Sequence, residues 1–407
     1  MTIHARNPLV LPVYVPCLLL MFGNGMLIPI LPLYAKTLSA SYGLIGVVLA
    51  AEGMGRLVGA LPAGILIGNL GRKSAMILGV GCIAVSTLAL FWARDIYEVV
   101  CLRLVAGVGG SLWHISCHAY LVDAAPVFHR GRALSIFGGI HRIGTFAGPA
   151  AAGELGRIYG LETPFLVFGG LATVVVFIAV SSFVSDTSSG PRNVRPGRLR
   201  PLLTIFKSHF RELATAGSGQ LFAQTIRAGR HVVVPLYAAD VIGLDVQAIG
   251  WIITISALLD MSLFYPAGHI MDRFGRKFAM VPCFLIQAVA MAAIPFTHSF
   301  TGLLLATALL GLGNGIGSGS MMTLGADLAP GDSIGEFLGA WRLVGETGHM
   351  GAPLVIGGIA DLLGLSPATF AIAGFGLLAA GAFAFLVPET LTVSAPPDRS
   401  PRGGPHE

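Results

Sequence analysis

The sequence predicts an all-α polytopic membrane protein with twelve transmembrane helices in two pseudo-symmetric six-helix bundles. Three observations lead to this fold class: the composition, the length of the apolar runs and an internal repeat. Hydrophobic residues make up 54% of the 407 positions, charged residues only 11%, and the mean hydropathy is +0.79. A soluble domain carries about 25% charged residues. So few charges cannot cover a water-facing surface, and most of the surface is therefore expected to face lipid.

The apolar runs have the length of membrane-spanning helices. Many of them extend over about 20 residues, which is what a helix needs to cross a bilayer. Because lipid offers the backbone no hydrogen-bond partners, repeated spans must be helices or a closed barrel, and these runs are too long for barrel strands. The first run starts near Leu9 and lacks a small-residue cleavage site. We therefore interpret it as the first span and not as a signal peptide.

The chain contains two related halves. The segment 266–277 is a short charged turn between two apolar runs, and a similar segment at 62–73 lies 204 positions earlier. Matches in one register over a wide span indicate a duplicated unit. The same offset pairs Gly107 with Gly311, Gly109 with Gly313, Asp123 with Asp327, Pro126 with Pro330, Gly144 with Gly348, Pro149 with Pro353 and Gly153 with Gly357.

We expect six spans in each half. An even number gives both halves the same orientation, so the repeat axis runs along the membrane normal. The predicted organisation is an N-terminal bundle (1–184), a cytoplasmic linker (185–209), a C-terminal bundle (210–388) and a disordered cytoplasmic tail (389–407). The spans lie near residues 10–35, 43–68, 74–93, 97–122, 131–158, 163–184, 210–239, 247–270, 278–297, 299–324, 334–362 and 366–388.

The distribution of lysine and arginine predicts the orientation. Short loops on the cytoplasmic side carry an excess of these residues. One set of loops holds only Lys36, Arg94 and Arg157. We therefore expect a multi-pass protein of the cell inner (plasma) membrane with both termini in the cytoplasm. The opposite, cytoplasmic set holds Arg6, Arg72, Lys73, Arg130, Arg132, Arg192, Arg195, Arg198, Arg200, Lys207, Arg273, Arg276, Lys277, Arg399 and Arg402.

Ionisable residues are distributed unevenly over the spans. The third, sixth, ninth and twelfth spans have none in their interiors. An ionisable group is costly against lipid and is kept where it lines water or meets a partner. We therefore expect every third helix to face lipid and the others to enclose a polar cavity between the halves. The ionisable residues of those other spans are Glu52, Arg56, Arg103, His114, His118, His141, Arg142, Arg227, Arg230, His231, Asp260, Arg342, Glu346 and His349.

Three motifs resemble those of the major facilitator superfamily of secondary transporters. The loop after the second span of the C-terminal half resembles the family's signature loop, and Arg103-x-x-x-Gly107 resembles its fourth-helix motif. The stretch from Gly144 to Gly153, with Gly148 and Pro149, resembles the fifth-helix motif associated with exporters of the drug:proton antiporter type. The resemblance covers the chain from about Leu9 to Pro388. The signature loop is carried by Gly268, Asp272, Arg273, Gly275, Arg276 and Lys277.

The first-half copy of that loop departs from the family pattern. Gly71, Arg72 and Lys73 are present, but Gly68 and Asn69 stand where the family has an acid and a base. The resemblance implies that the acid locks the cytoplasmic gate against the other half, so here only Asp272 can do so. We expect this carboxylate to meet a helix N-terminus or the basic loop of Arg130 and Arg132. In the alternative, the loop only sets topology through its positive charge.

Three carboxylates are candidates for proton coupling. Glu52 and Arg56 share a helix face and could neutralise each other. Glu346 has Arg342 four positions before it, whereas Asp260 needs a partner distant in sequence. We therefore favour Asp260 or Glu346, with Glu52 next. Arg103 could tune a neighbouring acid or hold an anion, or it could extend toward the outer interface.

The cavity is expected to carry more cations than anions. The six arginines are Arg56, Arg103, Arg142, Arg227, Arg230 and Arg342, against three carboxylates. This excess favours a substrate with a carboxylate or similar group. His114 and His118 are four positions apart, but no third ligand is near them, so we expect hydrogen-bonded histidines and no metal. The glycine-rich run 311–319 follows no strand, so we expect close packing or flexing of the tenth span and no nucleotide site.

These observations predict a secondary transporter that works by alternating access. We expect proton antiport that exports a small organic compound of anionic or amphipathic character, with proton-coupled uptake of an organic anion as the alternative. A channel or lipid flippase would need a continuous pore or a lateral opening, which the sequence does not indicate. No enzyme activity, cofactor or nucleic-acid partner is expected. The expected partners are the substrate, protons and the bilayer, and the expected state is a monomer.

Overall fold

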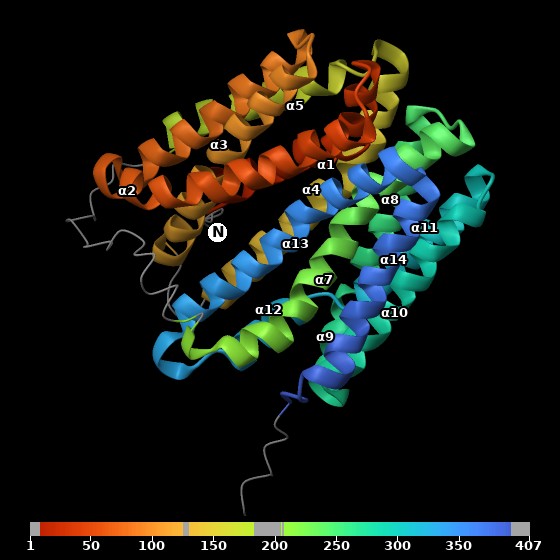
Figure 1. The fold of residues 1–407 in the computed structure, drawn as a ribbon. Coiled ribbons are helices and arrows are strands. Elements are labelled where there is room, and N and C mark those ends of the chain that lie inside the picture. The colour runs from red at the N-terminus through yellow and green to blue at the C-terminus, as the bar shows by residue number, and fades with distance from the viewer. Residues whose placement is uncertain (1–8, 125–129, 183–204, 206, 392–407) are drawn as a thin grey trace, which may run out of the picture.

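The computed structural model describes residues 9–124, 130–182, 205 and 207–391, and these ranges contain helices and no strand. The predicted linker and tail lie almost entirely outside the described residues. Figure 1 shows the helices as two groups of long rods, with the N-terminal half in red to yellow and the C-terminal half in green to blue. The all-α polytopic fold predicted from the sequence is the fold observed.

The N-terminal half consists of five long helices. They are α1 (Val15–Thr37), α2 (Tyr42–Ala89), α3 (Ile96–Ala124), α4 (Arg130–Tyr159) and α5 (Thr163–Ser182). The helix α2 contains the second and third predicted spans, which meet at Gly71 with φ 79° and ψ 164°. A side chain would be strained in this left-handed conformation, so glycine is needed where the chain turns between the two spans.

The C-terminal half has the same order of elements but more breaks. Its helices are α7 (Phe210–Tyr237), α8 (Val246–Ser262), α9 (Phe264–Phe274), α10 (Arg276–Ala293), α11 (Phe300–Ile316), α12 (Ser320–Leu328), α13 (Ile334–Leu363) and α14 (Leu365–Gly381). The eighth predicted span is bent by 40° between α8 and α9. The tenth is interrupted at residues 317–319. Gly275, with φ 106°, occupies the position equivalent to Gly71.

Every predicted span coincides with a helical segment. Within the described residues, eight helices are long and apolar enough to cross a membrane, or nine if the bent pair of α8 and α9 is one span. The helices α4, α7 and α13 fall outside this set because they carry many of the cavity arginines and histidines. Twelve crossings therefore stay a prediction, and the number of apolar spans supports a polytopic protein.

Glycines bring helix backbones into contact within each half. A Cβ atom on Gly107 of α3 would lie 2.1 Å from the carbonyl oxygen of Glu52 in α2. The equivalent Gly311 of α11 would place a Cβ 2.1 Å from the carbonyl oxygen of Ser256 in α8. Small residues permit such close approach, and van der Waals packing then holds helices together where lipid supplies no hydrophobic drive.

The halves meet at one end of the bundle through a pseudo-two-fold set of backbone contacts. A Cβ on Gly46 would lie 2.3 Å from the carbonyl oxygen of Pro353, and a Cβ on Gly250 would lie 2.4 Å from that of Pro149. The 204-residue offset maps the first contact onto the second. We call this end, which carries loops 38–41, 160–162 and 243–245, the sealed end; the charge distribution predicts that it faces away from the cytoplasm.

Polar side chains reinforce the sealed end. Asp240 accepts hydrogen bonds from Nζ of Lys36 and, at 2.7 Å, from the hydroxyl of Tyr42. The backbone N–H of Gly43 donates to Asp361 at 2.9 Å. Each of these contacts joins one half to the other. The hydrogen bonds that connect the halves run from this end to Arg142 at the middle of α4, where the site described below begins.

The helices predicted to be free of interior charge present apolar side chains to the outside. Phe177 of α5 is 69% exposed, Phe278 of α10 is 61% exposed, and Phe385, which follows α14, is 88% exposed. Apolar surface of this kind is stable against lipid tails and not against water. The helix α10 also has an inward face, which the sequence did not indicate, because Cys283 and Gln287 are fully buried there.

Candidate functional site

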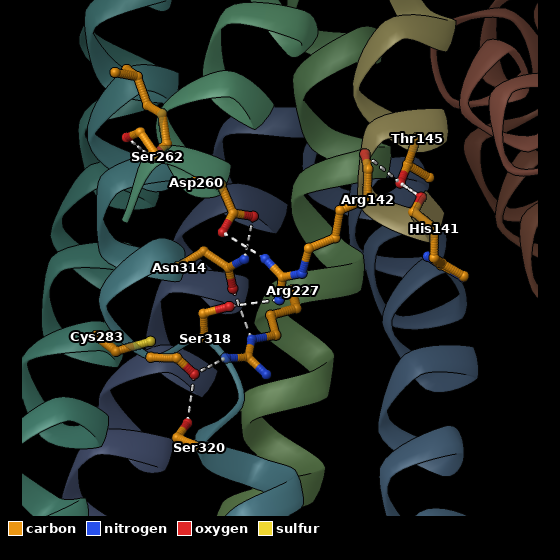
Figure 2. A network of polar contacts seen from close by, with 12 residues as sticks. His141, Arg142, Thr145, Arg227, Asp260, Ser262, Cys283, Asn314, Ser318 and Ser320 are labelled. Carbon is orange, nitrogen blue, oxygen red and sulfur yellow. Dashed lines mark hydrogen bonds and ion pairs between the residues drawn. The ribbon is translucent and has the colours of Figure 1, made fainter. Parts of the chain in front are cut away.

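Asp260 lies at the centre of a polar cluster in the C-terminal half. Its side chain is nearly buried, with 9% of the residue surface exposed. One carboxylate oxygen, Oδ2, accepts a hydrogen bond from Nδ2 of Asn314 at 2.6 Å and one from Nη2 of Arg230 at 3.5 Å. The other oxygen, Oδ1, is buried and accepts no hydrogen bond from the described residues. Figure 2 shows the side chains of Asp260 and Asn314 facing one another.

Arg142 reaches the cluster from the other half. It projects from α4, and its Nη1 atom lies 3.8 Å from Oδ1 of Asp260. Its Nη2 atom donates to the hydroxyl of Ser318 at 2.6 Å, and its guanidinium carbon lies 4.7 Å from the centre of the Phe264 ring. Figure 2 shows the side chain extending from α4 toward these partners. Arg142 of the N-terminal half thus contacts three residues of the C-terminal half near the middle of the bundle.

A cavity of about 180 Å³ adjoins Asp260 between the halves. Its volume is close to the roughly 150 Å³ of an engineered cavity that binds benzene. Apolar side chains form much of the wall, and a few polar groups converge on it, as in small-molecule sites. The lining residues are Ile28, Arg142, Thr145, Phe146, Arg230, His231, Val234, Ile253, Ser256, Ala257, Asp260, Met261, Thr307 and Leu310.

Arg227 extends the cluster away from the cavity. Its Nε atom donates to Oδ1 of Asn314 at 2.8 Å, so the Asn314 amide links Arg227 to Asp260. Its Nη2 atom donates to the carbonyl oxygen of Gly317 at 3.3 Å. The guanidinium carbon also lies 5.2 Å from the centre of the Phe284 ring. Arg227 therefore binds protein groups and does not line the cavity.

Glu52 and Arg103 form a second ion pair within the N-terminal half. Nη2 of Arg103 on α3 contacts Oε2 of Glu52 on α2, and only 6% of the arginine side chain is exposed. Arg56 lies 3.4 Å from the other carboxylate oxygen and is 36% exposed. Glu52 and Arg56 were expected to be able to neutralise each other; they do lie together, but the closer partner of Glu52 is Arg103. Arg103 does not extend to the outer interface, because it pairs with Glu52 and is buried inside the half.

Arg342 and Glu346 do not pair in the structure. No ion pair or hydrogen bond joins these two side chains, although they are four positions apart on α13 and both are described. Arg342 is exposed, and its charge acts on His114 and His118 of the opposite half. Glu346 is half-buried, and both it and Arg56 lie close enough to His349 to interact with it electrostatically.

The internal repeat places residues of opposite charge at equivalent positions of the two halves. Arg56 occupies the position equivalent to Asp260, and Arg142 occupies the position equivalent to Glu346. The contact between Arg142 and Asp260 therefore has a counterpart in Glu346 and Arg56, with the acid and the base on opposite halves. Only the first of these pairs approaches within 4 Å. This relation was present in the sequence offset and could have predicted the cross-half pair.

The histidines of α3 form a ring stack. The ring centres of His114 and His118 are 4.5 Å apart, and His118 lies 5.1 Å from the ring centre of Phe137 on α4. No group of three or more potential metal ligands occurs in the parts of the chain that the structure describes. The stack packs α3 against α4 beside the cleft.

The second-half signature loop makes its contacts within its own half. Arg276 donates to Asp272 at 2.9 Å and to Asp327 at 3.1 Å. Nζ of Lys277 donates to the carbonyl oxygen of Ala384 at 2.8 Å, while Gly268 lies in open space and Arg273 stacks on Phe274. The side chains of the predicted partners Arg130 and Arg132 lie outside the described residues, so the lock through Asp272 stays a prediction.

The first-half loop repeats one of these contacts. Nζ of Lys73 donates to the carbonyl oxygen of Val180 at 3.2 Å. Val180 is the equivalent of Ala384, so a lysine at the same place in each half binds the last turn of the sixth span. The neighbouring Arg72 adds positive charge to the same end of the bundle. Both loops therefore tie a turn to the end of a helix.

The Gly144 to Gly153 motif packs α4 on two sides. A Cβ on Gly144 would lie 2.6 Å from Cβ of Met21 in α1, and one on Gly148 would lie 2.4 Å from the carbonyl oxygen of Phe22. Pro149 and Gly153 instead face α8 of the other half, where a Cβ on Gly153 would lie 2.8 Å from the carbonyl oxygen of Val246. The motif thus sets the position of the helix that carries Arg142.

Comparison with known sequences gives a family match over nearly the whole chain. The profile of the Major Facilitator Superfamily matches residues 17–226 and 217–405. An uncharacterised MFS-type transporter of Methanocaldococcus jannaschii is 23% identical over 352 residues, covering 85% of this chain and 89% of the relative. Multidrug resistance protein 2 of Bacillus subtilis is 22% identical over 295 residues, covering 71% of this chain and 73% of the relative.

Solved structures share the fold. A bacterial homologue of the human lysosomal transporter Spinster, in an inward-facing and unoccupied conformation, superposes with a TM-score of 0.76. The alignment covers 94% of this chain and 97% of that structure at 14% identity. Identity at this level establishes similarity of fold and not of substrate.

Proposed function

Because the chain belongs to the Major Facilitator Superfamily, whose members are secondary transporters, we propose that it is a proton-coupled antiporter that exports a small amphipathic organic compound by alternating access. The observation that carries the proposal is Oδ1 of Asp260. It is a buried carboxylate oxygen without a hydrogen bond from the described residues, in a residue that lines the cavity between the halves.

This oxygen can serve a proton or a substrate, but not both. A substrate hydroxyl or N–H group binds most strongly to an ionised carboxylate, and a proton on Oδ1 turns this oxygen into a donor and removes the negative charge. Mutually exclusive binding is the requirement for antiport. The apolar part of the cavity wall, formed by residues such as Phe146, Ile253 and Leu310, would hold the body of an amphipathic compound.

Export is the direction favoured by two further observations. The Gly144 to Gly153 motif resembles that of exporters, and Multidrug resistance protein 2 of Bacillus subtilis is among the relatives. We place the protein in the inner (plasma) membrane with both termini in the cytoplasm, as its arginine-rich loops predict. In that orientation the sealed end faces outward, which fits an inward-facing state.

The second candidate is proton-coupled uptake of an organic anion. Arg142 and Arg230 both line the cavity, with Asp260 as the single carboxylate among the lining residues. A bound anion would sit beside Asp260, and like charges at short distance favour protonation of the carboxylate. Anion and proton would then bind together, which is the requirement for symport. The charge of the substrate therefore decides between the two candidates.

A vesicle experiment distinguishes them. Purified protein is reconstituted with a pH-sensitive dye inside, and benzamide, benzyltrimethylammonium or benzenesulfonate is added outside. These compounds are close in size to the cavity and differ in charge. For antiport we expect protons to leave the vesicles as an amide or cation enters, and no such movement in protein-free vesicles. Proton entry together with every active compound would contradict antiport and support symport.

Matched variants assign the proton site. We expect Asp260→Asn to abolish the proton movement, because an amide cannot titrate. Glu212→Gln, which neutralises an exposed carboxylate at the start of α7, is expected to behave like the wild type. Proton movement of normal size in Asp260→Asn would exclude Asp260 as the coupling group.

A further inference from the structure

The tenth predicted span is interrupted beside Asp260. The helix α11 ends at Ile316, α12 begins at Ser320, and Gly319 between them adopts φ 80° and ψ −17°. The equivalent stretch of the first half contains Trp113, His114 and Ile115 and continues as one helix, α3. The break is therefore specific to the half that carries Asp260.

Three side chains hold the broken segment. Arg227 donates to the carbonyl oxygen of Gly317 at 3.3 Å, and the hydroxyl of Ser320 donates to the same oxygen at 2.6 Å. Arg142 holds the hydroxyl of Ser318 from the other half at 2.6 Å. Both Ser318 and Ser320 are buried. Figure 2 shows these contacts below Asp260.

Arg142 also contacts Asp260 directly, and Arg227 is linked to it through Asn314. Arg142 lies 3.8 Å from its Oδ1 atom while it binds Ser318. Asn314 donates to its Oδ2 atom and accepts from Arg227, which binds Gly317. Two routes therefore connect one carboxylate to the break, one through Arg142 and Ser318 and the other through Asn314 and Arg227.

The two helices of the tenth span, α11 and α12, are packed against different parts of the C-terminal half. A Cβ on Gly315, just before the break, would lie 2.8 Å from the carbonyl oxygen of Asp260, so α11 is tightly packed on α8. Beyond the break, α12 is held to α13 by a hydrogen bond of 3.0 Å from Nε1 of Trp341 to the carbonyl oxygen of Met321. A change at residues 317–319 would therefore move α12 relative to a fixed α11.

We propose that Asn314 and Ser318 are positioning residues that transmit the charge of Asp260 to the break between α11 and α12, so that α12 loosens when Asp260 is protonated. The inference rests on the proposed role of Asp260 as the proton site. Ionised Asp260 attracts Arg142 and accepts from Asn314, which orders both routes. A neutral carboxyl group attracts Arg142 less and holds the amide less well, because hydrogen bonds to charged groups are the stronger ones.

Other charged groups surround Asp260 and contribute to any pH response. Arg142 and His141 lie on α4, and Arg227, Arg230 and His231 lie on α7. From α10 the thiol of Cys283 interacts electrostatically with Asp260, and α11 contributes the neutral Asn314. The three arginines keep their charge at neutral pH, whereas a histidine, like a carboxyl group, can change its charge with pH. An experiment must therefore separate Asp260 from the histidines.

Hydrogen exchange of the substrate-free protein in lipid nanodiscs tests the proposal. Protection factors of peptides covering residues 317–328 are compared between about pH 3 and about pH 8, a range wide enough to change the charge of a carboxyl group. We expect protection in the wild type to fall about tenfold at the lower pH, as for loss of one hydrogen bond to a charged group. Asp260→Asn should show low protection at both pH values, because its amide carries no charge whatever the state of the histidines.

The positioning residues have a matched control. Ser318→Ala and Asn314→Ala are each expected to lower protection at the higher pH and to remove the pH response. Ser262→Ala also deletes a hydroxyl, but one that bonds only to Leu259 of its own helix, and it should retain the wild-type response. A wild-type pH response in both Ser318→Ala and Asn314→Ala would overturn the proposal, as would pH-independent protection in the wild type.

The outcome is separable from that of the proposed function. If Asp260→Asn abolishes proton movement in vesicles while residues 317–328 show no pH response, Asp260 is the proton site and the relay is wrong. If the segment responds to pH through Asp260 while proton movement is normal in Asp260→Asn, the relay is present and the proposed coupling is wrong.

Discussion

At the residue scale, the ion pair of Glu52 and Arg103 contributes to stability because Arg103, with only 6% of its side chain exposed, would otherwise be a buried charge without its partner. We predict that Glu52→Gln destabilises the protein by about 3–5 kcal/mol, the cost of leaving a buried charge without its partner. Thermal unfolding in detergent checks this. The double variant Glu52→Gln with Arg103→Met should recover much of the loss, because both charges are then removed. Equal stability of the single variant and the wild type would contradict this account.

Glu389 gives a pH-dependent prediction outside the membrane. Burial acts to raise its pKa, but backbone N–H groups of Arg276, Lys277, Thr390 and Leu391 bond the ionised form and bring the pKa below the ordinary 4.5. A lowered pKa stabilises the folded state above the unfolded value, and this stability is lost as the pH falls through the folded value. Glu389→Gln should therefore unfold at a lower temperature than the wild type at neutral pH.

The difference between Glu389→Gln and the wild type should close as the pH falls through the lowered pKa of Glu389, where this carboxylate becomes protonated in the folded protein. Unfolding temperatures measured as the pH falls provide the check. The control Glu212→Gln removes an exposed carboxylate and should show no such pH-dependent difference. If the difference in unfolding temperature between Glu389→Gln and the wild type persists unchanged in strong acid, the charge of Glu389 is not the cause of that difference.

The sequence located the charged residues of the site but only some of their partners. Asp260 was expected to need a distant partner, and it has two, Arg230 at 3.5 Å and Arg142 of the other half at 3.8 Å. Arg103 and Glu52 were not paired in the prediction, because nothing in a sequence gives the distance between side chains on different helices. Asn314 and Ser318 were missed for another reason: an uncharged polar residue in a span can bond to its own helix, so it gives no signal of a functional contact.

At the element scale, glycines decide how closely the two halves approach at the sealed end. We predict that Gly46→Ala moves α2 away from α13 there, because its Cβ would lie 2.3 Å from the carbonyl oxygen of Pro353. Spin labels at Ser39 and Leu362, in a background without native cysteines, should then report longer distances. Gly351→Ala is the control, since nothing lies within 4 Å of its Cβ. Unchanged distances in Gly46→Ala would show that the seal tolerates a side chain.

The helix boundaries were largely predictable, because apolar length and glycine or proline interruptions set them. The predicted spans at 43–68 and 74–93 correspond to one helical element, α2, that turns at Gly71, and the spans at 247–270 and 299–324 are each divided in two. Flexing of the tenth span was expected from its glycines. The position of the break could not be predicted, because Arg227 and Arg142 fix it through contacts from two other helices.

At the scale of the whole molecule, the halves are joined by a symmetric seal at one end and by an asymmetric charge contact at mid-length. The seal uses equivalent glycines and prolines of both halves. The charge contact uses Arg142 and Asp260, while their counterparts Glu346 and Arg56 stay apart. A symmetric seal does not by itself favour one conformation over the other. A contact that includes a titratable group makes the stability of one conformation depend on protonation. The repeat accounts for the first of these features, and the difference between the halves produces the second.

The central claim is that the charge of Asp260 controls the separation of the halves. Double electron–electron resonance between spin labels at the exposed, equivalent positions Leu70 and Phe274 measures the end opposite the sealed end directly, in nanodiscs at about pH 3 and about pH 8. We predict that the wild type shifts toward shorter distances at the lower pH, because protonation releases Arg142 from Asp260, and that Asp260→Asn gives the low-pH distribution at both values. A wild-type distribution that does not change with pH, or an Asp260→Asn variant that shifts as the wild type does, would contradict the account.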